Sequence, residues 1–346
     1  MIILALPLSA SDNPYVDLLY SHMPSNGVVV KQFSLANVRE RCDICHIHWP
    51  DSMLTGNLLR ISINKVIRFW ILLLWVKLRW GAKIVWTVHN LEPHERALPI
   101  WWRRFFYSIW FRFVDGAIFM SDASRVAFEK KYKKQYESTV IPHGHYCDVY
   151  EKVVPDSQIH NELTIQSGDF VFGNYGKIRE YKNIPYLMRE FSKLNGDHYK
   201  LIVAGKVRER DHELLAEIEG LAAQDARIHF LQGFVSDERM KALYERTDYA
   251  VLPYRDILNS GSALLALSLG CSVLVPALPT MKELQSQLNS SFVRLIPDTG
   301  LTEEMITCSA HTPLRCQRSD LLAFEWNTLS SCLYEFYRQI CSEKGS

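Results

Sequence analysis

The sequence predicts an α/β protein made of two doubly wound domains, each built around a parallel sheet. The chain has 346 residues and 48% hydrophobic content, enough for two medium-sized cores. Strand-like runs alternate with helix-like runs in both halves, which indicates parallel strands joined by right-handed helical crossovers. Between the halves, residues 151–167 are polar and lose this periodicity, as a linker does.

The first half contains six strand-like runs, which predict an N-terminal Rossmann-like domain over residues 1–150. These runs are "IILALPL", "VVVKQFS", "CDICHIHW", "AKIVWTVHN", "GAIFMS" and "STVIPHG". Helical patterns separate them at about 14–24, 57–80, 100–113 and 121–134. The opening "MIILALPL" lacks the basic residues that begin a secretion signal, so we interpret it as the first strand.

The second half repeats this plan, so we expect a second Rossmann-like domain over residues 168–320. Its strand-like runs are "FVFGNYG", "YKLIVAG", "RIHFLQG", "YAVLPY" and "SVLVP". Residues 321–346 read as an amphipathic closing helix. In such folds, ligands bind beyond the carboxyl ends of the strands, so we expect the site in a cleft that the two domains face.

Charge and aromatic residues are concentrated in one zone of the first half. The formal net charge is only +1, and nothing global suggests nucleic acid, but residues 60–134 hold 15 Lys and Arg against five Asp and Glu. Eight of the nine tryptophans lie before residue 111. This asymmetry predicts a surface that meets something anionic.

Residues 65–80 and 101–113 are aromatic, aliphatic and cationic at once. The unbroken apolar run in the first, Phe69 to Val76, has only eight residues, whereas a bilayer-spanning helix needs roughly 20. Both segments could lie on an anionic membrane surface, with the aromatic rings among the headgroups. The alternative is a pair of buried helices whose long cations reach water.

The stretch "CDICHIHWPDSM" (42–53) invites a metal or redox interpretation. Side chains alternate along a strand, so Cys42 and Cys45 point to opposite faces and cannot share one metal ion. We therefore expect both to be core residues. His46 and His48 share a face, but two ligands are short of a zinc site. The eight scattered cysteines indicate a reducing compartment.

Two loops of the second half suit an anion. "GNYGKIREYKNI" places three cations, Lys177, Arg179 and Lys182, directly after a strand. In "PYRDILNSGSALLALSLG", the turn "NSGS" opens a helix whose first amides could bind a phosphate. The alternatives are a solvated basic loop and an ordinary helix cap. No G-x-G-x-x-G or Walker A loop follows a strand, which argues against dinucleotide oxidoreductases and P-loop enzymes.

In chain order, "HIHWPD", "WTVHN", "IPHGHY", "GKIREYKN", "VAGK", "LQGFVSDERMKALYERTDYAVLPY", "SGSALLALSLGCSVLVP" and "FEW" resemble a GT-B glycosyltransferase of the bacterial exopolysaccharide type. The resemblance covers nearly the whole chain. More narrowly, it is similar to the β-mannosyltransferases of xanthan-like repeat-unit assembly. It implies a nucleotide-sugar donor on the C-terminal domain and an acceptor on the N-terminal, membrane-facing domain.

The resemblance also implies a role for particular residues. The donor would contact Lys177, Arg179, Lys182, Asn259, Ser260, Gly261, Ser262, Gly233, Phe234 and His143. The acceptor would contact Asp12, Asn13, His48 and Trp49. Trp326, in the closing helix, would be structural. His89 would be a catalytic residue that contacts the donor sugar or phosphate, and we expect neither a metal nor a cofactor.

The chain departs from the retaining GT-B pattern at one place. Retaining members carry two glutamates eight positions apart, and the corresponding residues here are Ile257 and Leu265. The resemblance therefore favours inversion, which needs a general base for the acceptor hydroxyl. The candidate bases are Asp51, Glu92, Glu95 and Asp12, although each could instead be a helix cap or a solvated acid.

The prediction is therefore a peripheral glycosyltransferase at the cytoplasmic face of the inner membrane. It would move mannose from GDP-mannose onto a polyprenyl-diphosphate-linked oligosaccharide in exopolysaccharide or capsule biosynthesis. The alternatives are a retaining or UDP-sugar-dependent GT-B transferase, a catalytically inactive GT-B membrane scaffold, and a nucleotide-sugar epimerase.

Overall fold

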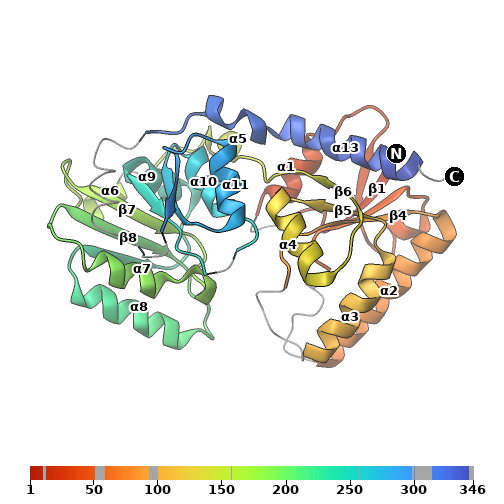
Figure 1. Cartoon of the computed structure of the whole chain (residues 1–346), viewed down its shortest axis with the longest axis horizontal. Coiled ribbons are helices and arrows are strands. Elements are labelled where there is room, and N and C mark those ends of the chain that lie inside the picture. The colour runs from red at the N-terminus through yellow and green to blue at the C-terminus, as the bar shows by residue number, and fades with distance from the viewer. Residues whose placement is uncertain are drawn as a thin grey trace. The chain divides into compact units, whose positions relative to one another are not determined.

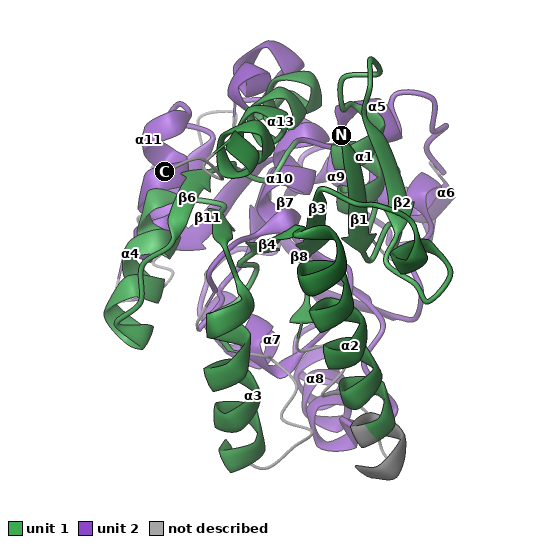
Figure 2. Ribbon diagram, turned by 90° about the vertical axis from the view of Figure 1, so that its right-hand side faces the viewer, with its two compact units in different colours: residues 1–144, 324–346 green, residues 145–323 purple. Residues whose placement is uncertain are grey.

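The structure, a computed structural model of the chain, describes residues 1–10, 13–50, 59–92, 100–156, 158–255, 257–297, 300 and 314–342. For residues 59–63 and 160 it describes the backbone only. The chain divides into two compact units (Figure 2). Unit 1 comprises Met1–Gly144 and Phe324–Ser346, and unit 2 comprises His145–Ala323. Each unit is built around a parallel sheet of six strands, which confirms the predicted fold class.

The sheet of unit 1 has the strand order β2-β1-β3-β4-β5-β6. Its strands are β1 (Ile2–Leu6), β2 (Val29–Gln32), β3 (Ile44–Ile47), β4 (Lys83–Thr87), β5 (Gly116–Phe119) and β6 (Glu137–Val140). The connecting helices are α1 (Tyr15–Ser21), η1 (Asn37–Arg39), α2 (Leu59–Trp80), α3 (Ile100–Phe113) and α4 (Asp122–Tyr132). All six strands coincide with predicted runs.

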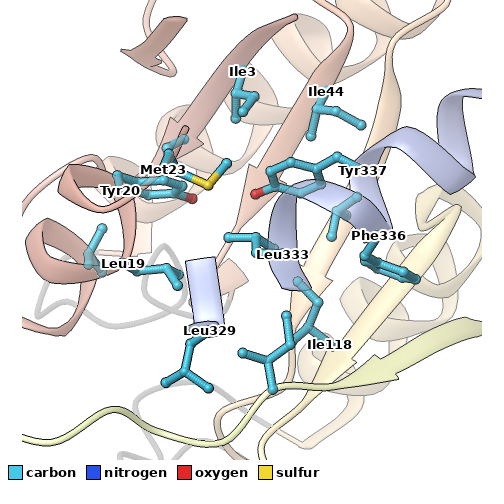
Figure 3. Close-up of a cluster of buried hydrophobic side chains, with 14 of the residues drawn as sticks. Ile3, Leu19, Tyr20, Met23, Ile44, Ile118, Leu329, Leu333, Phe336 and Tyr337 are labelled. Carbon is cyan, nitrogen blue, oxygen red and sulfur yellow. The ribbon is translucent and has the colours of Figure 1, made fainter. Parts of the chain in front are cut away.

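One face of this sheet is covered by α1 and by the last helix, α13 (Trp326–Ser342), which the chain adds after unit 2. Apolar side chains at helical spacing on α13, among them Leu329, Leu333 and Phe336, pack against Ile3 of β1 and Ile44 of β3 (Figure 3). The predicted closing helix is therefore part of the core of unit 1.

Helices α2 and α3 lie side by side in unit 1 (Figures 1 and 2). The ring of Trp70 on α2 is 5.3 Å from that of Phe106 and 5.1 Å from that of Phe113, both on α3. Lys77 on α2 donates to the carbonyl of Phe113 and pairs with Asp115 at 2.8 Å. In the part of the chain that the structure describes, no helix is long and apolar enough to cross a bilayer.

The sheet of unit 2 has the strand order β12-β11-β10-β7-β8-β9. Its strands are β7 (Phe170–Tyr175), β8 (Tyr199–Gly205), β9 (Ile228–Gln232), β10 (Tyr249–Val251), β11 (Ser272–Pro276) and β12 (Val293–Ile296). Its helices are α5 (Cys147–Tyr150), α6 (Gln158–Glu162), η3 (Glu180–Lys182), α7 (Ile184–Phe191), α8 (His212–Gln224), α9 (Asp237–Arg246), α10 (Gly261–Ser268), α11 (Pro279–Gln287) and η4 (Arg318–Phe324), which ends in unit 1.

Strand β12 is the one strand of these sheets that we did not predict. Its four residues, "VRLI", include a charged side chain, so the run is too short and too polar to stand out from the sequence. It pairs with β11 at the edge of the sheet, where a strand has one neighbour rather than two. The segment 151–167, predicted as a linker, contains α6 and lies within unit 2.

Candidate active site

The cationic loop of unit 2 leaves the carboxyl end of β7, one of the two central strands of the sheet. Gly176 adopts φ = +99°, a conformation that favours glycine, and turns the chain out of β7. The loop is then pinned to the neighbouring strand, because Gly176 N–H donates to the carbonyl of Ala204 at 2.9 Å and Ile178 N–H donates to that of Lys206 at 3.1 Å. This geometry carries Lys177, Arg179 and Lys182 to one edge of the sheet.

Lys182 differs from its two neighbours because its side chain is buried, with 5% of the residue exposed. Burial, together with the positive charges of Arg179 and Lys177, lowers the pKa of its ammonium to about 8. Among the described residues, no carboxylate lies within ion-pair distance of Lys182. A buried ammonium that lacks a carboxylate partner is costly in the ligand-free protein and attracts an anion.

The "NSGS" turn lies beside this loop. Arg255, just after β10, donates its backbone N–H to the carbonyl of Tyr181 at 3.2 Å and its Nε–H to Oδ1 of Asn183 at 3.0 Å. The rings of Tyr181 and Tyr254 are 6.0 Å apart. The structure therefore brings the two predicted anion-binding loops together at one sheet edge.

Ser260 caps α10, as the alternative interpretation of the "NSGS" turn proposed. Its Oγ accepts the N–H of Ala263 at 3.1 Å, and the residue is buried. Burial raises the pKa of Tyr254 to about 12, while hydrogen bonds with Ser262 and Ser260 lower it. Both serines are thus held by a buried tyrosine at the start of a helix, and the helix N-terminus still carries a positive partial charge.

The predicted donor contacts Gly233 and Phe234 follow β9 at the same edge of the sheet. Gly233 has φ = +133° and donates its N–H to the carbonyl of Gly205 at 3.1 Å. The next side chain, Phe234, is 87% exposed. An aromatic ring left in water at the carboxyl end of a strand has the chemistry to stack on a planar base.

In unit 1, three histidines lie just beyond the carboxyl ends of strands of the sheet. His48 follows β3, His89 follows β4, and His143 follows β6, and all three are at the carboxyl edge. Tyr15, the first residue of α1, lies among them, with ring-centre distances of 4.8 Å to His143, 5.3 Å to His89 and 5.9 Å to His48. The predicted site histidines therefore form one aromatic cluster.

Trp49 joins this cluster, because its ring stacks on that of His89 with centres 4.3 Å apart. His143 Nδ1 lies 2.8 Å from the carbonyl of Gly144, which can only accept, so His143 carries its proton on Nδ1. Burial lowers the pKa of His143 to about 4 and that of His48 to about 3. Both rings are therefore neutral near pH 7.

Beneath the cluster, a chain of buried polar side chains extends into unit 1. His46 is fully buried, and its two ring nitrogens contact the hydroxyls of Tyr20, Tyr337 and Thr87. The sequence predicted only that His46 and His48 share one face of the strand, and the 4.2 Å between their ring centres confirms this. The rest of the chain of polar side chains was not predicted. Its members come from four separate elements, α1, β3, β4 and α13, and the only signal in the sequence was the polar His46 inside an apolar strand.

The structure describes only some of the candidate acids. Asp51, Glu95 and Asp12 lie outside the described residues. Glu92 is described, and it forms ion pairs with Lys131 at 2.6 Å and Arg103 at 3.8 Å. Asn13 accepts the N–H of Tyr15 through Oδ1 at 3.0 Å, so it supports the first turn of α1.

The cysteines of the opening motif are core residues, as predicted. Cys42 and Cys45 are buried and free. Burial raises the pKa of the Cys42 thiol to about 11 and that of Cys45 well above its ordinary value. Both thiols are therefore protonated and unreactive near neutral pH.

Comparison with known proteins gives matches to both units. Residues 169–308 match the family model "Glycosyl transferases group 1". Over 341 residues, the chain is 26% identical to the GDP-mannose:glycolipid 4-beta-D-mannosyltransferase of Xanthomonas campestris pv. campestris, covering 97% of this chain and 91% of the relative. These matches confirm the predicted resemblance to GT-B glycosyltransferases.

Solved structures share the fold at lower identity. A glycosyltransferase from Rickettsia africae aligns over 100% of this chain and 99% of its own length, with a TM-score of 0.65 and 14% identity. Anabaena HepE, in complex with UDP and glucose, aligns over 99% of this chain and 98% of its own, with a TM-score of 0.61 and 16% identity. Both support the two-domain arrangement of parallel sheets.

Proposed function

We propose that this GT-B glycosyltransferase moves one mannosyl residue from GDP-mannose to a lipid-linked oligosaccharide. The donor and the acceptor class come from the 26% identical relatives, which are named GDP-mannose:glycolipid 4-beta-D-mannosyltransferases. The structural observation that carries the proposal is the buried ammonium of Lys182 among further cations at the carboxyl edge of unit 2. Such a site suits the diphosphate of a nucleotide-sugar.

The donor is held by unit 2 in this proposal. Lys182, Lys177 and Arg179 bind the diphosphate, together with the first amides of α10 at Gly261 and Ser262. The guanidinium of Arg179 is oriented by two carbonyls, those of Ile178 at 2.6 Å and Lys206 at 3.1 Å. Phe234 stacks on the base, and the Gly233 backbone flanks it.

In this proposal, the transfer inverts the configuration at C1 of the sugar. The acceptor hydroxyl oxygen attacks C1 while the bond from C1 to the diphosphate oxygen breaks, and the electron pair of that bond leaves with the diphosphate. A general base takes the hydroxyl proton, and Asp51, Glu95 and Asp12 are the candidates. The cations stabilise the charge on the leaving diphosphate. Ile257 and Leu265 offer no carboxylate for a retaining mechanism.

We further propose that unit 1 binds an anionic membrane surface through α2 and α3. The exposed apolar side chains on these helices are Ile67, Ile71, Leu74, Trp75, Leu78, Ile100, Trp101 and Phe105. Exposed cations accompany them, namely Lys65, Arg68, Arg79, Arg104 and Arg112. The two helices lie side by side (Figure 2) and pack together through Trp70 and Phe106, and we propose that their exposed side chains act as one surface. An apolar patch with a basic rim is typical of peripheral membrane binding.

Such a surface would hold the enzyme at the cytoplasmic face of the inner membrane, next to a polyprenyl-diphosphate-linked acceptor for exopolysaccharide or capsule synthesis. Flotation with vesicles tests this. The wild-type chain should float with vesicles that contain anionic lipid, and the double variant Leu78→Asp, Trp101→Asp should remain in solution. Val154→Asp, at another exposed apolar position in unit 2, is the matched control and should float normally. Flotation of the double variant like wild type would contradict the proposal.

Transfer itself is tested with purified enzyme and a lipid-linked oligosaccharide. Acceptor-dependent release of GDP from GDP-mannose, with a β-linked product by NMR, is the expected result. An α-linked product would exclude inversion, since the donor sugar is α-linked. Acceptor-dependent release of UDP would favour a UDP-sugar transferase, and sugar interconversion without acceptor would favour an epimerase. If no nucleoside diphosphate were released from any donor, the catalytic proposal would fail and a scaffold would remain.

A further inference from the structure

Arg103, on the first turn of α3, is a largely buried cation whose hydrogen-bond donors are unsatisfied. Its side chain is 12% exposed, and its Nε is buried without a hydrogen-bond partner. Its ion pair is with Glu92, whose Oε2 lies 3.8 Å from Nη1, beyond hydrogen-bond distance. Within the part of the chain that the structure describes, the guanidinium of Arg103 forms no hydrogen bond.

Arg227 in unit 2 shows how this protein satisfies another largely buried arginine. Its side chain is 16% exposed. It donates to the carboxylate of Asp225 at 2.7 and 2.9 Å and to the carbonyl of Leu194 at 2.7 Å. A charged group held away from water without such partners costs free energy. An anion that supplied hydrogen bonds to Arg103 would remove that cost.

Glu92 does not neutralise Arg103 alone, because a second cation shares its carboxylate. The Nζ of Lys131, on α4, lies 2.6 Å from Oε1 of Glu92. The Tyr132 hydroxyl donates to the carbonyl of Leu91, which fixes the backbone next to Glu92. Neither α2 nor α3 contains an acidic residue. The group formed by Arg103, Lys131 and Glu92 therefore keeps a net positive charge.

This cationic group lies between the proposed membrane surface of unit 1 and its histidine cluster. A crossover helix runs antiparallel to the strands that it joins, so the first turn of α3 is at the carboxyl edge of the sheet. Glu92 comes three residues after His89, a span of at most about 11 Å. Trp101 and Phe105, two exposed side chains of the proposed membrane surface, are on the first two turns of α3 with Arg103.

We infer that Arg103 and Lys131 bind a phosphate group carried by a membrane lipid. Two sources have this chemistry, the diphosphate of a lipid-linked acceptor and the headgroup of an anionic phospholipid. A phosphate oxygen about 2.7–2.9 Å from the guanidinium supplies the charge-assisted hydrogen bond that Glu92, at 3.8 Å, does not. In this arrangement the lipid chain lies in the bilayer beside Trp101. The inference rests on the proposed function in placing a membrane against α2 and α3.

Calorimetry with farnesyl diphosphate, a short isoprenyl diphosphate, tests the site without turnover. The titration uses the Lys182→Met background, so that the anion site of unit 2 does not compete. Adding Arg103→Gln should raise the Kd about 10- to 150-fold, the loss expected for a charge-assisted hydrogen bond. Arg41→Gln is the matched control, because Arg41 also has an acid at 3.8 Å, Asp43, but its side chain is 77% exposed. It should leave the Kd unchanged.

Flotation with phosphatidylglycerol vesicles identifies the source of the phosphate. A weaker affinity of Arg103→Gln for farnesyl diphosphate with normal flotation would assign the site to the lipid diphosphate. Normal affinity with vesicle binding lowered about tenfold or more would assign it to the phospholipid headgroup, because one surface charge accounts for only about fivefold. Normal affinity with a loss of about fivefold or less would overturn the inference. Arg41→Gln, with the same change in net charge, should behave like wild type.

Stability and kinetics separate a ligand site from a structural ion pair. Arg103→Met should leave the unfolding midpoint unchanged or raise it, because no hydrogen bond is lost. A lowered midpoint together with unchanged affinity for farnesyl diphosphate would show a structural role and overturn the inference. In the transfer assay, Arg103→Gln should raise KM for the lipid-linked acceptor and leave kcat within about twofold, since Arg103 binds away from the reacting atoms.

The binding and flotation results do not depend on catalysis. An enzyme that is inactive toward every donor, but whose affinity for farnesyl diphosphate falls in Arg103→Gln, would refute the proposed transfer and leave this site intact. An active enzyme whose Arg103→Gln variant matches wild type in affinity, flotation and KM would refute the site and leave the proposed transfer intact.

Discussion

Replacing Lys182 with methionine should make the ligand-free protein more stable and at the same time weaken its binding of nucleoside diphosphates. The two effects have one cause, the burial of an ammonium that no described carboxylate neutralises. In the ligand-free protein, the charge is held at a cost that a methionine of similar length does not have. In the proposed complex with a nucleoside diphosphate, the same charge would meet a phosphate oxygen.

The structure sets the magnitude of both effects. A pKa that falls from the ordinary 10.5 to about 8 corresponds to about 3 kcal/mol, at about 1.4 kcal/mol per pKa unit. This value is an upper bound for the gain in the free energy of unfolding at pH 7. The lost charge-assisted hydrogen bond is worth about 1.5–3 kcal/mol, so the Kd for GDP should rise about 10- to 150-fold.

The pH dependence has a definite sign. Below pH 8 the Lys182 ammonium is charged in both the folded and the unfolded chain, so the folded protein carries the full free-energy cost of burying that charge. Between pH 8 and 10.5, the folded protein loses a proton that the unfolded chain still binds, so the stability of the wild-type protein rises toward that of the variant. Affinity of the wild-type protein for GDP should fall over the same rise in pH, since the ammonium is lost.

Urea unfolding at pH 7 and pH 9.5, with and without GDP, measures all of these quantities. Lys193→Met is the matched control, because Lys193 is exposed and pairs with Glu190 at 2.7 Å, and it should change neither stability nor affinity appreciably. A ligand-free Lys182→Met protein that is less stable than wild type at pH 7 would refute the reasoning, as would unchanged affinity for GDP.

Three further substitutions test the proposed base contact, the cap of α10 and the packing of Trp326. Phe234→Ala should weaken GDP binding by about 1–3 kcal/mol by calorimetry without changing the unfolding midpoint, because its ring is exposed; a lowered midpoint would mean a structural role. Ser260→Ala should lower the free energy of unfolding by about 1 kcal/mol through loss of the α10 cap, and an unchanged value would argue against that cap. Gly144→Ala should destabilise the protein by about 1–3 kcal/mol, since its Cβ would overlap the Trp326 ring, whereas Gly168→Ala, with open space around it, should not.

The sequence predicted the fold well because the signal was local. Eleven of the twelve strands of the two sheets coincide with runs of apolar residues followed by a turn or a loop, and the exception, β12, is a short edge strand containing Arg294. The parallel pairing within each sheet was expected, because chains that alternate strand and helix form parallel sheets through helical crossovers.

The cationic loop of the site was also predictable from the local sequence, but the burial of its side chains was not. Sequence spacing identified Lys177, Arg179 and Lys182 as cations after a strand. It could not show which of them is buried, because the burial of Lys182 depends on the conformation of η3. The chain of buried polar side chains around His46 could not be predicted from the sequence. Tyr337 and His46 are 291 residues apart, and only the packing of α13 on the sheet brings them together.

The carboxyl edges of the two sheets differ in charge, and the proposed inverting transfer would gain from that difference. Unit 2 presents a buried ammonium with further cations, which in the proposed mechanism would stabilise the diphosphate as its charge grows. Unit 1 presents histidines that burial keeps neutral. A cation beside the general base would lower the pKa of its carboxyl and weaken it as a proton acceptor. In the proposed mechanism, neutral imidazoles avoid this cost, so the burial of these histidines would leave the general base a strong proton acceptor.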